Sequence, residues 1–126
     1  MSLANYLKSE VGNVIIDNAG VKYINDTFFV TSSTYKTADQ WGTAEATVAN
    51  YTVLAKTPSG DKETFNITVL ADKFAVSHTV FGRVNFGTEL LDVQCTVTSG
   101  IVKVKLIGKT PEKASVSIAK SYVGPL

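Results

Sequence analysis

The sequence predicts an all-β protein, an antiparallel β-sandwich of about seven to nine short strands with a short N-terminal arm or helix. Two observations carry this prediction. Thr and Val are abundant and Leu is scarce, and β-branched residues fit the pleated, half-buried surface of a sheet. Apolar and polar residues also alternate along short runs that are separated by turn residues. The helices that would connect the strands of a parallel α/β fold are missing from the pattern.

The clearest element is a hairpin over residues 92–108 that turns at Ser99 and Gly100, where glycine supplies the positive φ that such turns require. Pairing outward from the turn gives three apolar cross-strand pairs: Val97 with Val102, Cys95 with Val104, and Val93 with Leu106. The opposite, wet face receives Gln94, Thr96, Lys103 and Lys105. A sheet with one apolar face needs a second layer to cover it, which is the architecture of a sandwich.

Further strands are expected over residues 14–16, 21–24, 28–30, 45–57, 63–70, 74–86 and 115–123. Three of these ranges show a clear apolar face. The face consists of Tyr51 and Val53 in residues 45–57, of Phe65, Ile67 and Val69 in residues 63–70, and of Phe74, Val76, His78, Val80 and Val84 in residues 74–86. Residues 31–40 are polar and are expected to form a loop. Trp41 ends that loop, and it either pins an aromatic ring against the sheet or lies exposed at an interface.

The chain divides into an N-terminal arm or attachment segment, residues 1–20, and a β-sandwich domain, residues 21–126. Within the arm, residues 2–11 are the best candidate for a helix, with Ser2 as N-cap and Gly12 as stop. Its apolar residues at helical spacing are Leu3, Tyr6, Leu7 and Val11. An isolated helix of this length is marginal in water, so the arm either lies on its own domain or docks on a neighbouring subunit. In the second case these four residues form an assembly interface.

Charge and hydropathy predict neither a nucleic-acid partner nor a membrane partner. The 12 Lys and Arg nearly balance the 11 Asp and Glu, and neither sign gathers into a run. No stretch is long and apolar enough for a membrane span. No signal peptide is recognisable, so synthesis in a cytoplasm is expected.

The sequence offers few groups for catalysis or metal binding. His78 is the single histidine, and it falls on the apolar face of its strand, where a core or rim imidazole is expected rather than a base. The single cysteine, Cys95, is expected to be a small core residue, and one His with one Cys cannot make a zinc site. Gly82 and Gly87 have the spacing of a phosphate-binding loop, but Thr88-Glu89 replaces the required Lys and hydroxyl residue. We therefore expect no enzyme, no catalytic residue, no cofactor and no metal.

The order of these features resembles the small β-sandwich modules of tailed-bacteriophage virion structural proteins, of the tail-fibre, neck, baseplate or head-decoration type. The segments that carry the resemblance are residues 28–29, 33–38, 49–53, 63–70, 78–84, 91–93, 100–106 and 115–118. Two positions depart from the pattern of those modules. Ala71-Asp72-Lys73 stands where a His-Asp-Gly turn is common, and Val80-Phe81 precedes Gly82 in place of an acidic residue and Tyr.

The resemblance implies a non-enzymatic virion structural protein, made in the host cytoplasm, that binds copies of itself and a capsid or tail neighbour as a head decoration, neck or tail component. Its partners would be other virion proteins, and it would be a homo-oligomer, with a trimer expected from the threefold sites of such particles. An alternative is an adhesin-like or carbohydrate-binding module that uses Tyr35 and Trp41 as a stacking platform. That alternative predicts an exposed Trp41.

Overall fold

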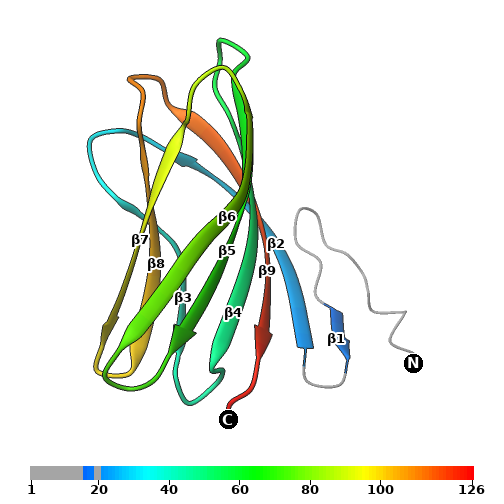
Figure 1. Ribbon diagram of the computed structural model, residues 1–126, viewed down its shortest axis with the longest axis vertical. Helices are drawn as coiled ribbons and strands as arrows, with labels where there is room; N and C mark the ends of the chain where they lie inside the picture. The colour runs from blue at the N-terminus through cyan, green and yellow to red at the C-terminus, as the bar shows by residue number, and fades with distance from the viewer. Residues whose placement is uncertain (1–15, 19–20) are drawn as a thin grey trace.

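The computed structural model describes residues 16–18 and 21–126, and these fold into two antiparallel β-sheets that pack face to face (Figure 1). The predicted β-sandwich is confirmed. The helix expected over residues 2–11, with Leu3, Tyr6, Leu7 and Val11, lies outside the described residues. The nine strands of the described part are β1 (Ile16–Asn18), β2 (Val21–Val30), β3 (Lys36–Gly42), β4 (Val48–Lys56), β5 (Lys62–Ala71), β6 (Val76–Phe86), β7 (Leu91–Thr98), β8 (Ile101–Gly108) and β9 (Ala114–Val123).

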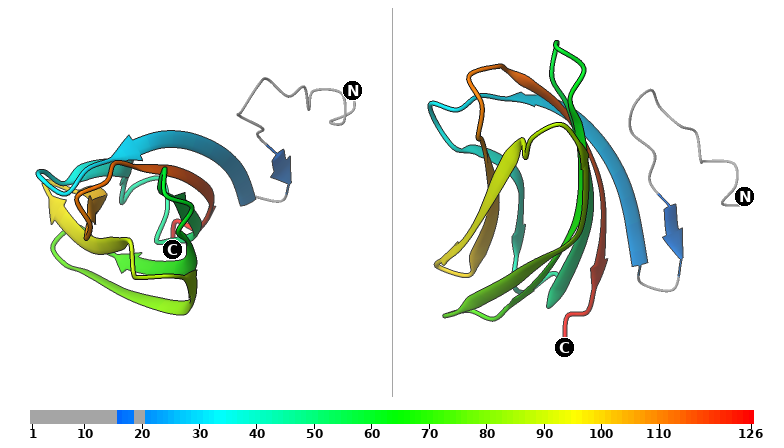
Figure 2. Two further views of the ribbon diagram at one scale, coloured as in Figure 1. Left: turned by 90° about the horizontal axis from the view of Figure 1, so that it is seen from above. Right: turned by 45° about the horizontal axis from the view of Figure 1, so that its top comes forward.

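The larger sheet has six strands in the order β1-β2-β9-β4-β5-β6, and the smaller has three in the order β3-β8-β7. The last strand, β9, thus lies inside the larger sheet, between β2 and β4. Figure 2 shows the two layers from above, with β1 beyond β2 on the side away from the three-stranded sheet. Strands β1 and β2 form the first hairpin, in which Asn18 pairs with Val21.

The hairpin over residues 92–108 has the register that the sequence predicts. Val97 pairs with Val102, Cys95 with Val104, and Val93 with Leu106. Ser99 has φ 52° and Gly100 has φ 75°, and two positive values in succession are typical of a two-residue type I′ turn. This turn matches the right-handed twist of the flanking strands, which is why it joins β7 to β8 so tightly.

The core lies between the inner faces of the two sheets. The predicted inward residues of β4 and β5 are buried, and so are alternate residues of β8 and β9. The largest apolar side chains that are fully enclosed are Tyr51, Phe65, Ile67, Leu90, Leu91, Leu106, Ile118, Val30, Val53, Val69 and Val102. Every second residue of these strands therefore points into one apolar layer between the sheets, as the alternation in the sequence predicts.

A bulge in β6 overturns part of the predicted face of that strand. Thr64 of β5 pairs with Val84, and Asn66 pairs with Phe81, so Gly82 and Arg83 together oppose the single residue Phe65. Gly82 has φ 68°, a conformation that glycine adopts without steric cost. The extra residue reverses the alternation, so Arg83 points inward and Val84 points to solvent. The prediction that Val84 shares the apolar face of Val76 and Val80 is wrong for this reason.

Two element boundaries also differ from the prediction. Phe74 precedes β6 and is exposed, because Asp72 forms a turn in which its Oδ1 accepts hydrogen bonds from the N–H groups of Phe74 and Ala75, both at 2.8 Å. Residues 36–42, expected largely as a loop, form strand β3. A second bulge between Thr37 and Asp39 breaks the alternation there, so the sequence gives no clear strand pattern.

Glu63 joins the two sheets at one end of the sandwich. It lies on the inner face of β5 and is 1% exposed. Its Oε2 accepts a hydrogen bond from Arg83 Nη1 at 2.6 Å, and its Oε1 accepts one from the N–H of Leu90 at 2.9 Å. Arg83 Nη1 also donates to the carbonyl of Leu91 at 3.3 Å, and its guanidinium lies 4.5 Å from the centre of the Phe65 ring. Glu63 and Arg83 together hold the start of β7 against the larger sheet.

We predict that Arg83→Met destabilises the protein by about 3–5 kcal/mol, because it leaves the buried Glu63 carboxylate without its cation. The double variant Glu63→Gln/Arg83→Met should recover part of this loss, since no charge is then buried. Urea unfolding measures the stability of both variants. The control is Lys36→Met, which removes an exposed cation that has no ion pair in the described residues. An Arg83→Met variant within about 0.5 kcal/mol of wild type would contradict the prediction.

Candidate functional site

The outer face of the three-stranded sheet is a polar surface with two free cations. Its centre is a shallow depression of about 340 Å³, which we call the basic face and which is lined by Gln40, Thr96, Thr98, Ile101, Lys103 and Lys105. The register explains the grouping, because Gln40 of β3 and Thr96 of β7 both pair with Lys103 of β8. Directly paired residues of a sheet point to the same side.

The charge of the basic face is uncompensated within the described part of the chain. Lys103 is exposed and Lys105 half-buried, and neither belongs to an ion pair there. Two residues apart on one strand, their side chains leave the same face about 7 Å apart along β8. The amide of Gln40 and the hydroxyls of Thr96 and Thr98 both donate and accept hydrogen bonds. This arrangement suits a ligand with hydroxyl and carboxylate groups.

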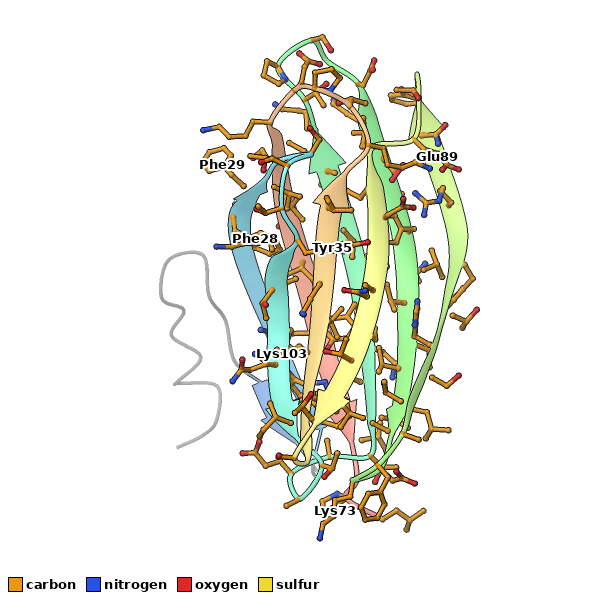
Figure 3. The ribbon with its side chains drawn as sticks, turned by 90° about the vertical axis from the view of Figure 1, so that its left-hand side faces the viewer. Phe28, Phe29, Tyr35, Lys73, Glu89 and Lys103 are labelled. Carbon is orange, nitrogen blue, oxygen red and sulfur yellow. The ribbon has the colours of Figure 1, made fainter. Side chains whose placement is uncertain are left out.

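The two residues of the predicted stacking platform lie in different environments. Tyr35 is 45% exposed, and Figure 3 shows it on the same side of the molecule as Lys103. Trp41 is 5% exposed, and its Nε1 donates to the hydroxyl of Tyr51 at 3.1 Å. Trp41 therefore pins its ring against the larger sheet and offers no face to a ligand. The candidate assembly residues Leu3, Tyr6, Leu7 and Val11 lie outside the described residues.

Trp41 belongs to a second polar group, the Asp39 cluster, which lies between the sheets and consists of Asp39, Trp41, Tyr51, Lys120 and Tyr122. Asp39 Oδ2 accepts hydrogen bonds from the hydroxyls of Tyr51 at 2.7 Å and Tyr122 at 2.6 Å. Asp39 Oδ1 accepts one from Lys120 Nζ at 2.9 Å. The rings of Trp41 and Tyr122 meet edge to face, with centroids 6.2 Å apart. Both carboxylate oxygens are thus occupied, and the cluster ties β3 to β4 and β9.

The Asp39 cluster keeps both tyrosines protonated. Burial, and next the negative charge of Asp39, raise the pKa of Tyr51 far above its ordinary value. Burial, and next the hydrogen bond to Asp39, raise the pKa of Tyr122 in the same direction. Each hydroxyl can donate to the carboxylate only while it holds its proton, so the hydrogen bonds to Asp39 add to the effect of burial on both pKa values.

The remaining candidate groups are isolated from these surfaces. Burial raises the pKa of the Cys95 thiol to about 11, which removes the thiolate needed for nucleophilic attack near neutral pH. His78 is exposed on the edge strand β6. Over residues 16–18 and 21–126, the structure contains no group of three or more His, Cys, Asp and Glu able to hold a metal ion. The same residues form no helix that could cross a membrane.

The basic face and the Asp39 cluster were only partly visible in the sequence. The hairpin pattern puts Thr96, Lys103 and Lys105 on one polar face, but no pattern in the sequence indicates that Gln40 joins them. Asp39 and Lys120 are 81 residues apart in the chain, and only the pairing of distant strands brings them together. A polar residue repeated on the apolar side of a strand, such as Lys120 after Ile118, is the one local signal of that cluster.

The fold is similar to that of a solved phage protein. A tailspike protein from Acinetobacter baumannii bacteriophage Fri1, described as a capsular polysaccharide depolymerase, matches with a TM-score of 0.57 and 10% identity, over 99% of this chain and 22% of the tailspike. The tailspike protein of Acinetobacter phage vB_ApiP_P1 matches with a TM-score of 0.42 and 10% identity, over 88% of this chain and 23% of its own. No protein-family model and no curated protein matches the chain.

The similarity to the Fri1 tailspike confirms the resemblance to a phage tail protein at the level of the fold, and it corrects one expectation. We expected a protein that is not an enzyme, and this is contradicted, because the Fri1 tailspike, which contains a similar fold, is described as a depolymerase. The chain spans about a fifth of the length of that tailspike.

We predict that Tyr51 and Tyr122 ionise only when the protein unfolds. Because the pKa of each is raised in the folded state, their stabilising effect is complete below the ordinary tyrosine pKa of about 10 and is lost as the pH rises above it. In an alkaline titration followed at 295 nm, part of the signal of the five tyrosines should appear together with the loss of circular dichroism.

The variants Tyr51→Phe and Tyr122→Phe should each reduce that unfolding-coupled signal. Tyr35→Phe, which removes an exposed tyrosine, is the matched control and should leave it unchanged. Complete ionisation of all five tyrosines while the folded spectrum persists would show that the Asp39 cluster does not hold these protons.

Proposed function

We propose that this chain is a β-sandwich module of a bacteriophage tail protein and that it binds an acidic polysaccharide on the basic face. The observation that carries the proposal is the fold likeness over 99% of the chain to a tailspike described as a capsular polysaccharide depolymerase. The exposed hydrogen-bonding surface around two free lysines supports it from the chain's own residues. In this proposal the module holds the polysaccharide, and cleavage belongs to the whole tail protein.

The chemistry of the basic face favours an acidic glycan over a neutral one. The ammonium groups of Lys103 and Lys105 attract the carboxylates of uronic-acid residues, and no described carboxylate neutralises them first. Gln40, Thr96 and Thr98 supply groups that can hydrogen-bond sugar hydroxyls in either direction. Tyr35, on the same side of the molecule (Figure 3), offers an aromatic ring at one end of this face.

As a tail module, the chain would be part of the virion and would contact other tail proteins. Mass spectrometry of density-purified particles of the encoding phage should detect this sequence as a stable constituent. Its absence from such particles, while the protein is abundant in the lysate, would contradict the tail-protein part of the proposal. Glycan binding by the basic face is tested separately, by the affinity for alginate and dextran.

We predict that the wild-type chain binds a polyuronate, such as alginate, more tightly than neutral dextran. The variant Lys103→Glu/Lys105→Glu should lose about tenfold or more in affinity, because each surface charge pair contributes up to about 1 kcal/mol and reversal makes both repulsive. Binding should also weaken with added salt. Isothermal titration calorimetry or affinity electrophoresis measures these effects.

The matched control is Lys56→Glu/Lys73→Glu, which makes the same change in net charge at two exposed lysines outside the basic face. It should bind alginate as tightly as the wild type. If both variants lose affinity equally, the attraction comes from net charge and the basic face is not a site. Equal binding of alginate and dextran by the wild type would contradict the acidic specificity.

A further inference from the structure

The outer face of the six-stranded sheet carries an uncovered apolar corner, formed by Leu54, Val84 and Phe86. These side chains are 50%, 62% and 68% exposed. Leu54 and Val84 flank Thr64 in one row across β4, β5 and β6, and Phe86 lies opposite Lys62 in the next row. Together they line a depression of about 170 Å³. Contiguous exposed apolar surface of this kind marks a contact site.

The backbone of β6 argues against a second copy as the occupant by edge pairing. β6 is the edge strand of its sheet, but the bulge at Gly82 and Arg83 interrupts the row of backbone groups it could offer. Bulges at an edge prevent continuous pairing with another chain. The apolar corner therefore needs an occupant that contacts side chains rather than the strand edge.

We propose that the apolar corner is the docking site for the N-terminal segment of the same chain, residues 2–11. The sequence predicts an amphipathic helix there, whose apolar residues need cover because so short a helix is marginal alone. At helical spacing from Leu3 and Leu7, Glu10 falls on the same side as the apolar residues. It would meet Lys56 and Lys62, which pair with each other across β4 and β5 beside the corner and have no ion-pair partner in the described residues.

The distances favour docking within one chain. Ile16 lies in register with Tyr23 on β2, and through Ser121 with Asn50 on β4. Counting strand spacings and residues along the strands puts Leu54 about 20 Å and Val84 about 28 Å from Ile16. Residues 12–15 reach at most about 14 Å, and a helix over residues 2–11 adds about 15 Å. The predicted helix would thus extend from about 14 to about 29 Å from Ile16, the interval that holds Leu54 and Val84.

The direction of the chain agrees with these distances. β1 runs antiparallel to β2, with Ile16 opposite Tyr23 and Asn18 opposite Val21. Going back from Ile16 toward residue 12 therefore leads toward the β2 residues of higher number, which share their end of the sheet with Leu54 and Val84. The sequence left open whether the arm covers its own domain or a neighbour, and the reach of the arm supports its own domain.

Disulfide trapping in the full-length chain tests this assignment. The test protein carries Cys95→Ala, Leu7→Cys and Leu54→Cys, because Leu54 lies at the distance from Ile16 that Leu7 can reach. Its matched control carries Gln94→Cys in place of Leu54→Cys. Gln94 is exposed and lies on the outer face of the three-stranded sheet, opposite Lys105 in the register. Under mild oxidation, the test protein should form a cross-link within one chain at least about tenfold faster than the control, because a disulfide needs its two Cα atoms within about 7 Å.

Electrophoresis without reductant and mass spectrometry distinguish the outcomes, and circular dichroism shows that both variants are folded. An internal cross-link at monomer mass supports the proposal. A covalent dimer would overturn it and assign the corner to the arm of a neighbouring copy. Cross-linking no faster than in the control would overturn it as well, because the arm would then lie elsewhere.

Discussion

Glu63 places a carboxylate on the inner face of the six-stranded sheet, where its neighbours on that face of the strand are Phe65, Ile67 and Val69. A buried charge is tolerated only when it is paired and hydrogen-bonded. The bulge at Gly82 meets this need, since it turns Arg83 inward. The same carboxylate then accepts the N–H of Leu90, so the crossing from one sheet to the other depends on this single residue.

The Asp39 cluster also links the two sheets, because Asp39 of β3 is hydrogen-bonded to Tyr51 of β4 and to Lys120 of β9. With two buried carboxylates holding the sheets together, the outer faces are free to differ in chemistry. The three-stranded sheet presents the lysines, the amide and the hydroxyls of the basic face, and the six-stranded sheet presents the apolar corner. The glycan binding and the arm docking that we propose would therefore occupy opposite sides of the domain.

Local pattern was enough to predict a two-layered sandwich and the register of one hairpin, β7–β8. The turn at Ser99 and Gly100 fixed the β7–β8 pairing, because hairpin contacts are short in sequence and the side-chain period is two. Bulges defeated the same logic, since one extra residue at Gly82 reverses every later side chain in β6. The contacts of Asp39 were equally inaccessible, because its partners come from strands whose neighbours in space are not neighbours in sequence.

The position of β9 has a consequence for how the protein is made. This strand supplies the partner edge of both β2 and β4, although it is the last of the nine to leave the ribosome. Until residues 114–123 emerge, β2 and β4 of the nascent chain each keep one edge without its partner strand. The large sheet thus closes only after all nine described strands have been synthesised, and polypeptides cut short before residue 114 lack the strand that joins its two halves.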